Sequence, residues 1–177
     1  MRLGVMRFAI MRFAITRFGI AAALCALTAG AWGAGFKVEL QVPRLQVAEY
    51  HAPYVAFWVR QADSGAVTPL GLWYDDQEKW LKDLRLWWRR TGRGQSAPYD
   101  GLTGATRRPG THTVDFSELP ALADLPKGDY ELVVEAAREV GGREVVRLPF
   151  HWPVTDATTV RADGEQELGA VELYLAP

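Results

Sequence analysis

The chain is patterned mainly by an alternation of apolar and polar residues, which is typical of half-buried β-strands. The alternation is clearest at 36–42, where Lys37, Glu39 and Gln41 separate apolar residues. Because successive side chains of a strand point to opposite faces of its sheet, this spacing produces one apolar and one polar face. A similar alternation predicts a second strand at 130–138, and further strands are predicted at 54–60, 67–73, 111–116, 144–152 and 169–175.

Turn signals between these runs indicate how the strands connect. Gly141 and Gly142 stand between 130–138 and 143–152, and a two-residue glycine turn there predicts a hairpin. Seven short strands with turn signals predict an all-β fold, an antiparallel β-sandwich. The pattern P-x-G-x-Y-x-L-x-V-E-A at 126–136 resembles the late strands of immunoglobulin-like and fibronectin-like bacterial sandwiches.

One segment, 76–90, has a helical spacing instead. Its apolar stripe predicts one inserted amphipathic helix and consists of Trp80, Leu81, Leu84, Trp87 and Trp88. We expect Trp80 and Leu84 to lie in the core, with Trp87 or Trp88 nearer the surface. Asp75 and Glu78 are spaced as a capping box, and two arginines at 89–90 suit the negative end of the helix dipole.

The first 31 residues have the features of a secretory signal peptide. They contain four arginines and no acid, and an apolar run at 18–27 leads to Ala29-Gly30-Ala31, a small-x-small cleavage site. The run is shorter than the about 20 residues that a stable membrane anchor needs. We therefore expect residues 1–31 to be a signal peptide and residues 32–177 to form a single β-sandwich domain. The expected product is periplasmic, with no transmembrane segment in the mature chain.

Cysteine content and charge narrow the possible chemistry. The one cysteine, Cys25, lies in the leader, so the mature chain is expected to lack disulfides, thiolate clusters and thiol nucleophiles. The leader holds four of the 20 basic residues and none of the 21 acidic ones, so residues 32–177 carry a net charge of −5. This charge argues against general nucleic-acid binding.

Basic residues nevertheless gather in one part of the sequence. Six arginines fall between positions 85 and 108, namely Arg85, Arg89, Arg90, Arg93, Arg107 and Arg108. Because the planar guanidinium fork suits phosphate, the gathering predicts an anion site there or nearby. A solvated basic face is the alternative interpretation.

The segment 100–106, which reads D-x-x-T-G-A-T, is the candidate functional motif of the chain. It resembles the acceptor motif of FMN-binding domains in sodium-pumping NADH:quinone reductases and of other substrates of the periplasmic flavin transferase. The resemblance implies a covalent FMN, joined by a phosphoester to Thr106, with Asp100 assisting recognition by the transferase. Gly104, which can adopt positive φ, and Ala105 would keep the backbone open to that enzyme. A simple turn between strands is the alternative.

The residues around the motif complete the predicted site. Arg107 and Arg108 follow the acceptor, where those domains usually place another hydroxyl residue, and would face the flavin phosphate or the anionic reduced ring. An isoalloxazine also needs an aromatic or apolar platform. The predicted cofactor-binding residues are Asp100, Thr103, Gly104, Ala105, Thr106, Arg107, Arg108, Trp87, Trp88 and Tyr99. No catalytic residue and no metal ligand is predicted.

Three spaced segments also resemble one protein family. K-W-L-K-D-L at 79–84, D-G-L-T-G-A-T-R-R-P-G at 100–110 and G-D-Y-E-L-V-V-E-A-A-R-E at 128–139 are similar to the predicted bacterial periplasmic proteins called domain of unknown function 2271. The resemblance implies a small exported sandwich domain. It also implies a periplasmic flavin transferase and a membrane PepSY-type redox protein as partners in extracytosolic electron transfer.

Two other classes of function stay open. A cofactor-free binding or accessory module of a periplasmic redox or metal-handling system is the main alternative, with His51, His112 and His151 as available nitrogen ligands. These histidines lack the close spacing of a helical metal site, which favours ordinary histidines. A hydrolase is less favoured because the chain has no G-x-S-x-G motif. An electron carrier or accessory protein is therefore expected rather than a catalytic enzyme.

Overall fold

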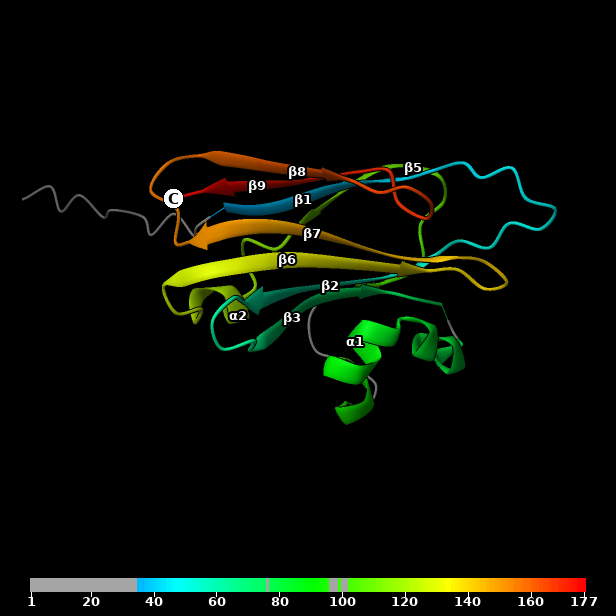
Figure 1. Cartoon of the computed structure of the whole chain (residues 1–177), viewed down its shortest axis with the longest axis horizontal. Coiled ribbons are helices and arrows are strands. Elements are labelled where there is room, and N and C mark those ends of the chain that lie inside the picture. Colours follow the sequence, from blue (N-terminus) through cyan, green and yellow to red (C-terminus); the bar gives the residue numbers. More distant parts are fainter. Residues whose placement is uncertain (1–34, 76, 96–98, 100–101) are drawn as a thin grey trace, which may run out of the picture. The chain divides into compact units, whose positions relative to one another are not determined.

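The computed structural model describes residues 35–75, 77–95, 99 and 102–177. Nine strands form two sheets that face each other in an all-β sandwich, which confirms the predicted fold class (Figure 1). The strands are β1 (Gly35–Val42), β2 (Tyr54–Gln61), β3 (Val67–Trp73), β4 (Leu102–Gly104), β5 (Gly110–Asp115), β6 (Gly128–Ala137), β7 (Arg143–Trp152), β8 (Thr158–Asp163) and β9 (Ala170–Ala176).

The two sheets differ in size and in pairing. Sheet A has four strands in the order β5-β1-β9-β8, all antiparallel. Sheet B has five strands in the order β4-β3-β2-β6-β7, and the short β4 pairs with β3 in parallel. All seven predicted strands are present, and the sequence analysis missed β4 and β8.

The main core lies between the sheets. Strand β1 alternates buried and outward residues, as its sequence predicted, and Phe36, Val38 and Leu40 are fully buried. Phe36 makes edge contacts with three aromatic rings, at centroid distances of 6.3 Å to Phe116, 5.6 Å to Phe150 and 6.0 Å to Trp152. This inter-sheet cluster joins the two sheets through apolar contacts.

A second apolar cluster covers the outer face of sheet B. The covering segment contains a 3₁₀ helix η1 (Glu78–Asp83), the helix α1 (Arg85–Arg90) and a short 3₁₀ turn η2 (Gly92–Gly94). In Figure 1, α1 lies on the side of sheet B that faces away from sheet A. Because both faces of the sheet are covered, six consecutive residues of β2 are buried. A further helix, α2 (Pro120–Ala123), lies in the connection from β5 to β6.

The predicted single helix at 76–90 is in fact two helical pieces that break at Leu84. Leu84 has φ −73° and ψ 68°, which is not helical, and its side chain is fully buried. The capping box is also wrong, because η1 begins after Gln77 without a side-chain cap. Leu84 is core as predicted, Trp80 is only half-buried, Trp87 is buried and Trp88 lies nearer the surface.

The break is stabilised by a buried carboxylate from the sheet. Glu135 of β6 is fully buried and accepts hydrogen bonds from the backbone N–H groups of Leu86 (2.9 Å) and Trp87 (2.7 Å). Its Oε1 also accepts from Arg143 Nε of β7 at 2.6 Å. These N–H groups begin α1 and have no partner within the helix, so Glu135 fixes the start of α1 to the sheet.

The predicted hairpin between β6 and β7 is present, but its turn is different. Arg138 O accepts from Gly141 N, so the central residues of the turn are Glu139 and Val140 rather than the glycine pair, and Val140 takes a positive φ of 51°. The side chain of Arg138 forms a buried bidentate ion pair with Glu167, at 2.9 and 3.1 Å. A Cβ on Gly142 would lie 2.5 Å from Glu167 Oε1. Glycine is needed there for close approach to that carboxylate rather than for a two-residue turn.

Candidate cofactor-attachment site

The candidate motif lies where the chain passes from sheet B to sheet A. Thr103 and Gly104 belong to β4 at the edge of sheet B, and Gly104 O accepts from Tyr74 N at 2.9 Å. Residues 105–109 have no regular structure and lead to β5 at the edge of sheet A. Asp100 and Gly101, which begin the motif, lie outside the described residues.

The described part of the motif is accessible. Thr103 and Ala105 are exposed, and Thr106 is half-buried. Positive φ among the described glycines is confined to Gly65 and Gly110, so Gly104 does not use the left-handed region. A Cβ on Gly104 would meet its nearest neighbour, Trp73 Cδ1, at an ordinary 3.7 Å. The openness of the segment therefore comes from its position beside an edge strand rather than from a glycine conformation.

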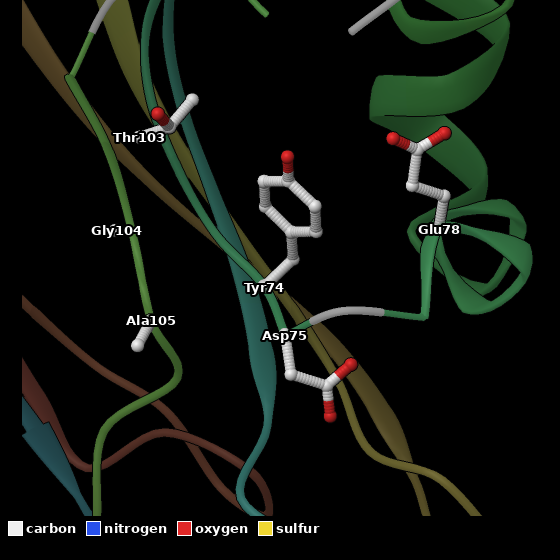
Figure 2. Close-up of a pocket in the computed structure, with 6 residues that line it drawn as sticks. All are labelled: Tyr74, Asp75, Glu78, Thr103, Gly104 and Ala105. Carbon is white, nitrogen blue, oxygen red and sulfur yellow. The ribbon is translucent and has the colours of Figure 1, made fainter. Parts of the chain in front are cut away.

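A cleft of about 420 Å³ opens directly beside this segment. Its walls are Tyr74, Asp75, Glu78, Thr103, Gly104 and Ala105. Figure 2 shows the Tyr74 ring between Thr103 and Glu78. The cleft therefore has an aromatic wall, two carboxylates and three residues of the motif. The sequence analysis missed Tyr74 and gave Asp75 and Glu78 only a capping role, although Tyr74 and Asp75 directly follow the strand 67–73.

The two carboxylates of the cleft are held differently. Asp75 Oδ1 accepts from the Tyr54 hydroxyl and, at 2.9 Å, from Gln77 N, which fixes the turn after β3. Burial, followed by the hydrogen bond with Asp75, raises the pKa of Tyr54, so the phenol stays protonated as a donor. Glu78 is exposed at the start of η1. Asp75 is thus a structural anchor, while Glu78 is free to face a ligand.

A line of aromatic rings runs from the cleft across the outer cluster. Ring centroids are separated by 5.8 Å for Tyr74 and Tyr99, 5.7 Å for Tyr99 and Trp87, and 6.3 Å for Trp87 and Trp88. Trp87 and Tyr99 are 2% and 7% exposed, and Trp88 is half-buried. Of these four rings, only Tyr74 lines the cleft. Burial raises the pKa of the Tyr99 phenol, and the nearby Glu78 carboxylate adds to this effect.

The arginines that are close in sequence do not gather at one place. Arg107 is exposed and stacks over the Trp73 ring, with its guanidinium carbon 5.4 Å from the ring centroid. The backbone carbonyl of Arg108 lies 2.8 Å from His112 Nε2. Arg90 lies in the last turn of α1, as predicted for the helix dipole, and lines a different pocket. The candidate motif therefore has Arg107 and Arg108 beside it in sequence, whereas Arg90 lines another pocket.

The three histidines have separate partners. His151 Nδ1 lies 2.8 Å from Asp129 Oδ1, and His51 lies 3.2 Å from Glu49. The His112 ring makes an edge contact with Trp73 at 5.9 Å. Within the described residues, no group of three or more His, Cys, Asp or Glu side chains is placed to hold a metal ion.

Comparison with known proteins identifies the family of this sandwich domain. The family described as predicted periplasmic protein, domain of unknown function 2271, matches residues 35–170, which is most of the chain. The chain belongs to this family, as its sequence resemblance indicated, and we place it in the periplasm. No described helix is long and apolar enough to cross a membrane. Searches of curated proteins and of solved structures found no match.

Proposed function

We propose that this protein is a periplasmic electron carrier with FMN attached covalently to Thr106. The observation that supports the proposal most directly is that three consecutive residues of the motif, Thr103 to Ala105, line an open cleft. A modifying enzyme and a tethered ring both need such space. The half-buried Thr106 follows the cleft on an irregular segment, outside both apolar clusters.

The attachment is a phosphoryl transfer. Thr106 Oγ attacks the FMN phosphorus of a flavin dinucleotide, and a new P–O bond replaces the phosphoanhydride bond. The nucleoside monophosphate leaves, and the hydroxyl proton is released. No oxidant or reductant is required, and the product gains the mass of FMN less one water. The transferase supplies the catalytic groups, so this chain needs only an accessible acceptor.

The cleft gives the tethered ring a defined environment. Tyr74 provides an aromatic wall on which an isoalloxazine can pack, a role that the sequence had suggested for Trp87, Trp88 or Tyr99. Asp75 and Glu78 place negative charge at the same wall. Because carboxylates disfavour an anionic reduced flavin, this cleft would lower the reduction potential of the flavin. The protein sets position and potential while the flavin carries the electrons.

Co-expression with a periplasmic flavin transferase tests the attachment. We expect a denatured band that fluoresces under ultraviolet light and an intact mass that is raised by one FMN less one water. Thr106→Ala should remove both signals, and Thr106→Ser should retain them because serine keeps the acceptor hydroxyl. Thr111→Ala is the matched control, since it removes an exposed hydroxyl outside both the motif and the cleft lining and should leave the modification intact.

An unmodified mass in the presence of active transferase would overturn the proposal. A modification that persists in Thr106→Ala would also overturn it, because the acceptor would be another residue. With FMN absent, the alternative of an accessory module would become the leading hypothesis.

The electrostatic role of the cleft has its own test. Glu78 is exposed, so Glu78→Gln should keep the fold while removing one negative charge beside the ring. Redox titration of the flavinylated protein should give a higher midpoint potential for this variant. Glu118→Gln, a change at an exposed glutamate that does not line the cleft, is the control and should leave the potential unchanged.

The partners implied by the family resemblance fit this proposal. A membrane PepSY-type redox protein would exchange electrons with the flavin, and the flavin transferase would load it. Mixing the flavinylated protein with such a reduced membrane partner should bleach the flavin absorbance. A flavin that stays oxidised in that mixture would count against this partner and leave the attachment itself untouched.

A further inference from the structure

A second pocket lies on the outer face of sheet B, beside the end of α1. Its volume is about 170 Å³, and it shares no lining residue with the cleft next to the flavin motif. The lining residues are Trp58, Arg60, Val67, Leu86, Arg90, Glu131, Val133 and Arg147. The pocket thus brings together arginines from β2, α1 and β7, which are far apart in the sequence.

Strand register explains how this pocket forms. Trp58 pairs with Val133, which pairs in turn with Arg147, so these residues form one row across β2, β6 and β7. The next row on the same face pairs Arg60 with Glu131. Trp58 and Val133 are each 1% exposed and form an apolar floor. The helix α1 ends at Arg90, and the basic side chains surround the apolar floor beside this end.

The charges of the pocket are not balanced by the other residues that line it. Arg60 pairs with Glu131 at 3.2 Å, which leaves two of the three guanidinium groups without a carboxylate among the lining residues. Within the described part of the chain, Arg90 and Arg147 make no ion pair. Two uncompensated positive charges around a small apolar floor match a dianion better than a monoanion.

Another basic hollow, at the opposite end of α1, provides a contrast. It is lined by Arg85, Arg138 and Arg143 among others. There, Arg138 is paired with buried Glu167 and Arg143 with buried Glu135. Two of its three arginines are therefore already used to hold the fold, whereas Arg90 and Arg147 of the pocket on the outer face of sheet B are available to a ligand.

We propose that the pocket of Arg60, Arg90 and Arg147 binds a phosphate-type oxyanion. A phosphate monoester carries about −1.5 to −2 charge at neutral pH, which matches the two free guanidinium groups, and arginine can bind its oxygens in pairs. The pocket is smaller than the about 300 Å³ at which sites for drug-sized ligands begin. It therefore accommodates the phosphate group itself, with the rest of any ester extending into solvent.

Titration of the flavin-free, ¹⁵N-labelled mature protein with inorganic phosphate at constant ionic strength tests the proposal. We expect saturable shifts of the Trp58 indole N–H signal and of the arginine Nε–H signals of Arg60, Arg90 and Arg147. Arg90→Ala should weaken binding by about tenfold or more, because it removes charged hydrogen bonds. Arg89→Ala removes the same charge one residue earlier, outside the pocket lining, and should change binding by no more than about twofold.

Further titrations define the ligand. Glu131→Gln should tighten phosphate binding because it releases Arg60 from its internal partner. Acetate should bind more weakly than phosphate. Phenyl phosphate binding more tightly than inorganic phosphate would identify a phosphate ester as the ligand class, and the reverse order would identify free phosphate.

Three outcomes would overturn the proposal. The first is a linear, unsaturated shift with phosphate in a folded protein, and the second is equal weakening by Arg89→Ala and Arg90→Ala. The third is acetate binding as tightly as phosphate. Arg147→Ala, at an exposed strand position, provides a second variant if Arg90→Ala disturbs α1. Because the protein carries no flavin in these titrations, their result is independent of the attachment at Thr106.

Discussion

The apolar cluster between the sheets and the cluster beneath the helices are held together by different interactions. In the inter-sheet cluster, aromatic and aliphatic side chains of long strands interlock, as around Phe36. In the outer cluster, short helical pieces are attached to sheet B through the fully buried Glu135. The first cluster therefore depends on apolar area, whereas the second also depends on one carboxylate. This difference predicts which changes unfold the whole domain and which release only the cover.

The largest effect should come from Phe36→Ala in the inter-sheet cluster. The ring is fully buried and contacts three other aromatic rings, so its loss leaves a cavity between the sheets. We expect a loss of about 3–5 kcal/mol in the free energy of unfolding, measured by urea denaturation followed by circular dichroism. Tyr174→Ala, at a 37% exposed position of sheet A, is the control and should have a small effect. An equal loss of unfolding free energy in the two variants would show that the contacts of the Phe36 ring do not dominate the stability of the inter-sheet cluster.

The next largest effect should come from Glu135→Ala, and it should be local. Its removal leaves the N–H groups of Leu86 and Trp87 without their acceptor, at a cost of about 2 kcal/mol. Hydrogen exchange should become faster at 85–94, while β1 in the inter-sheet cluster keeps its protection. Uniformly faster exchange in both regions would contradict the separation of the two clusters. Glu131→Ala, at another outward position of β6, should leave α1 protected.

A smaller effect should come from Gly92→Ala, which overpacks the outer cluster. An added Cβ would lie only 2.8 Å from Trp87 Cε3, so the ring or the turn must shift. We expect a loss of about 1.5 kcal/mol, measured by thermal and urea unfolding. Gly104→Ala is the matched control, since its Cβ would meet Trp73 at 3.7 Å and should change stability by no more than about 0.5 kcal/mol. If Gly104→Ala destabilised the protein more than Gly92→Ala, this result would contradict the backbone geometry described at Gly104.

The smallest effect should come from Glu144→Gln at the end of the sandwich. Burial alone would raise the pKa of Glu144, but backbone N–H groups outweigh burial and lower it below its model-compound value of 4.5. The donors are Glu165, Leu168, Gln166 and Glu167. At neutral pH we expect a loss of about 1 kcal/mol, because a neutral amide accepts these bonds less strongly.

The pH dependence of the Glu144 contribution has a definite sign. Because the folded state favours the carboxylate, the stabilisation is complete above pH 4.5 and is lost as the pH falls through the lower folded pKa. The difference between wild type and Glu144→Gln should therefore shrink in acid, which urea unfolding at neutral and acidic pH will measure. A difference in unfolding free energy that stays constant with pH would show that the stabilisation does not depend on the ionisation of Glu144.

Sequence periodicity predicted most of the sandwich but only part of the candidate site. The seven predicted strands are present, because alternation marks a strand that is covered on one face and a continuous apolar run, as in β2, fits a strand that is covered on both. β8 was missed because only Val160 and Ala162 give it an apolar side, at the edge of a sheet. β4 was missed because its three residues pair in parallel with a distant strand, which leaves no local pattern. The motif at 100–106 was visible in the sequence, but the cleft with Tyr74 and Glu78 was not.

The sequence by itself determined the all-β class, the family and the amphipathic character of 76–90. The tertiary structure decided where that helix breaks, because Glu135, about 50 residues later, provides the acceptor for the N–H groups of α1. It also decided which arginines share a pocket, because strand register places Arg60 and Arg147 on one face of sheet B, where α1 adds Arg90. Local patterns record which side of an element is apolar, whereas partners that are distant in sequence are chosen only when the elements pack.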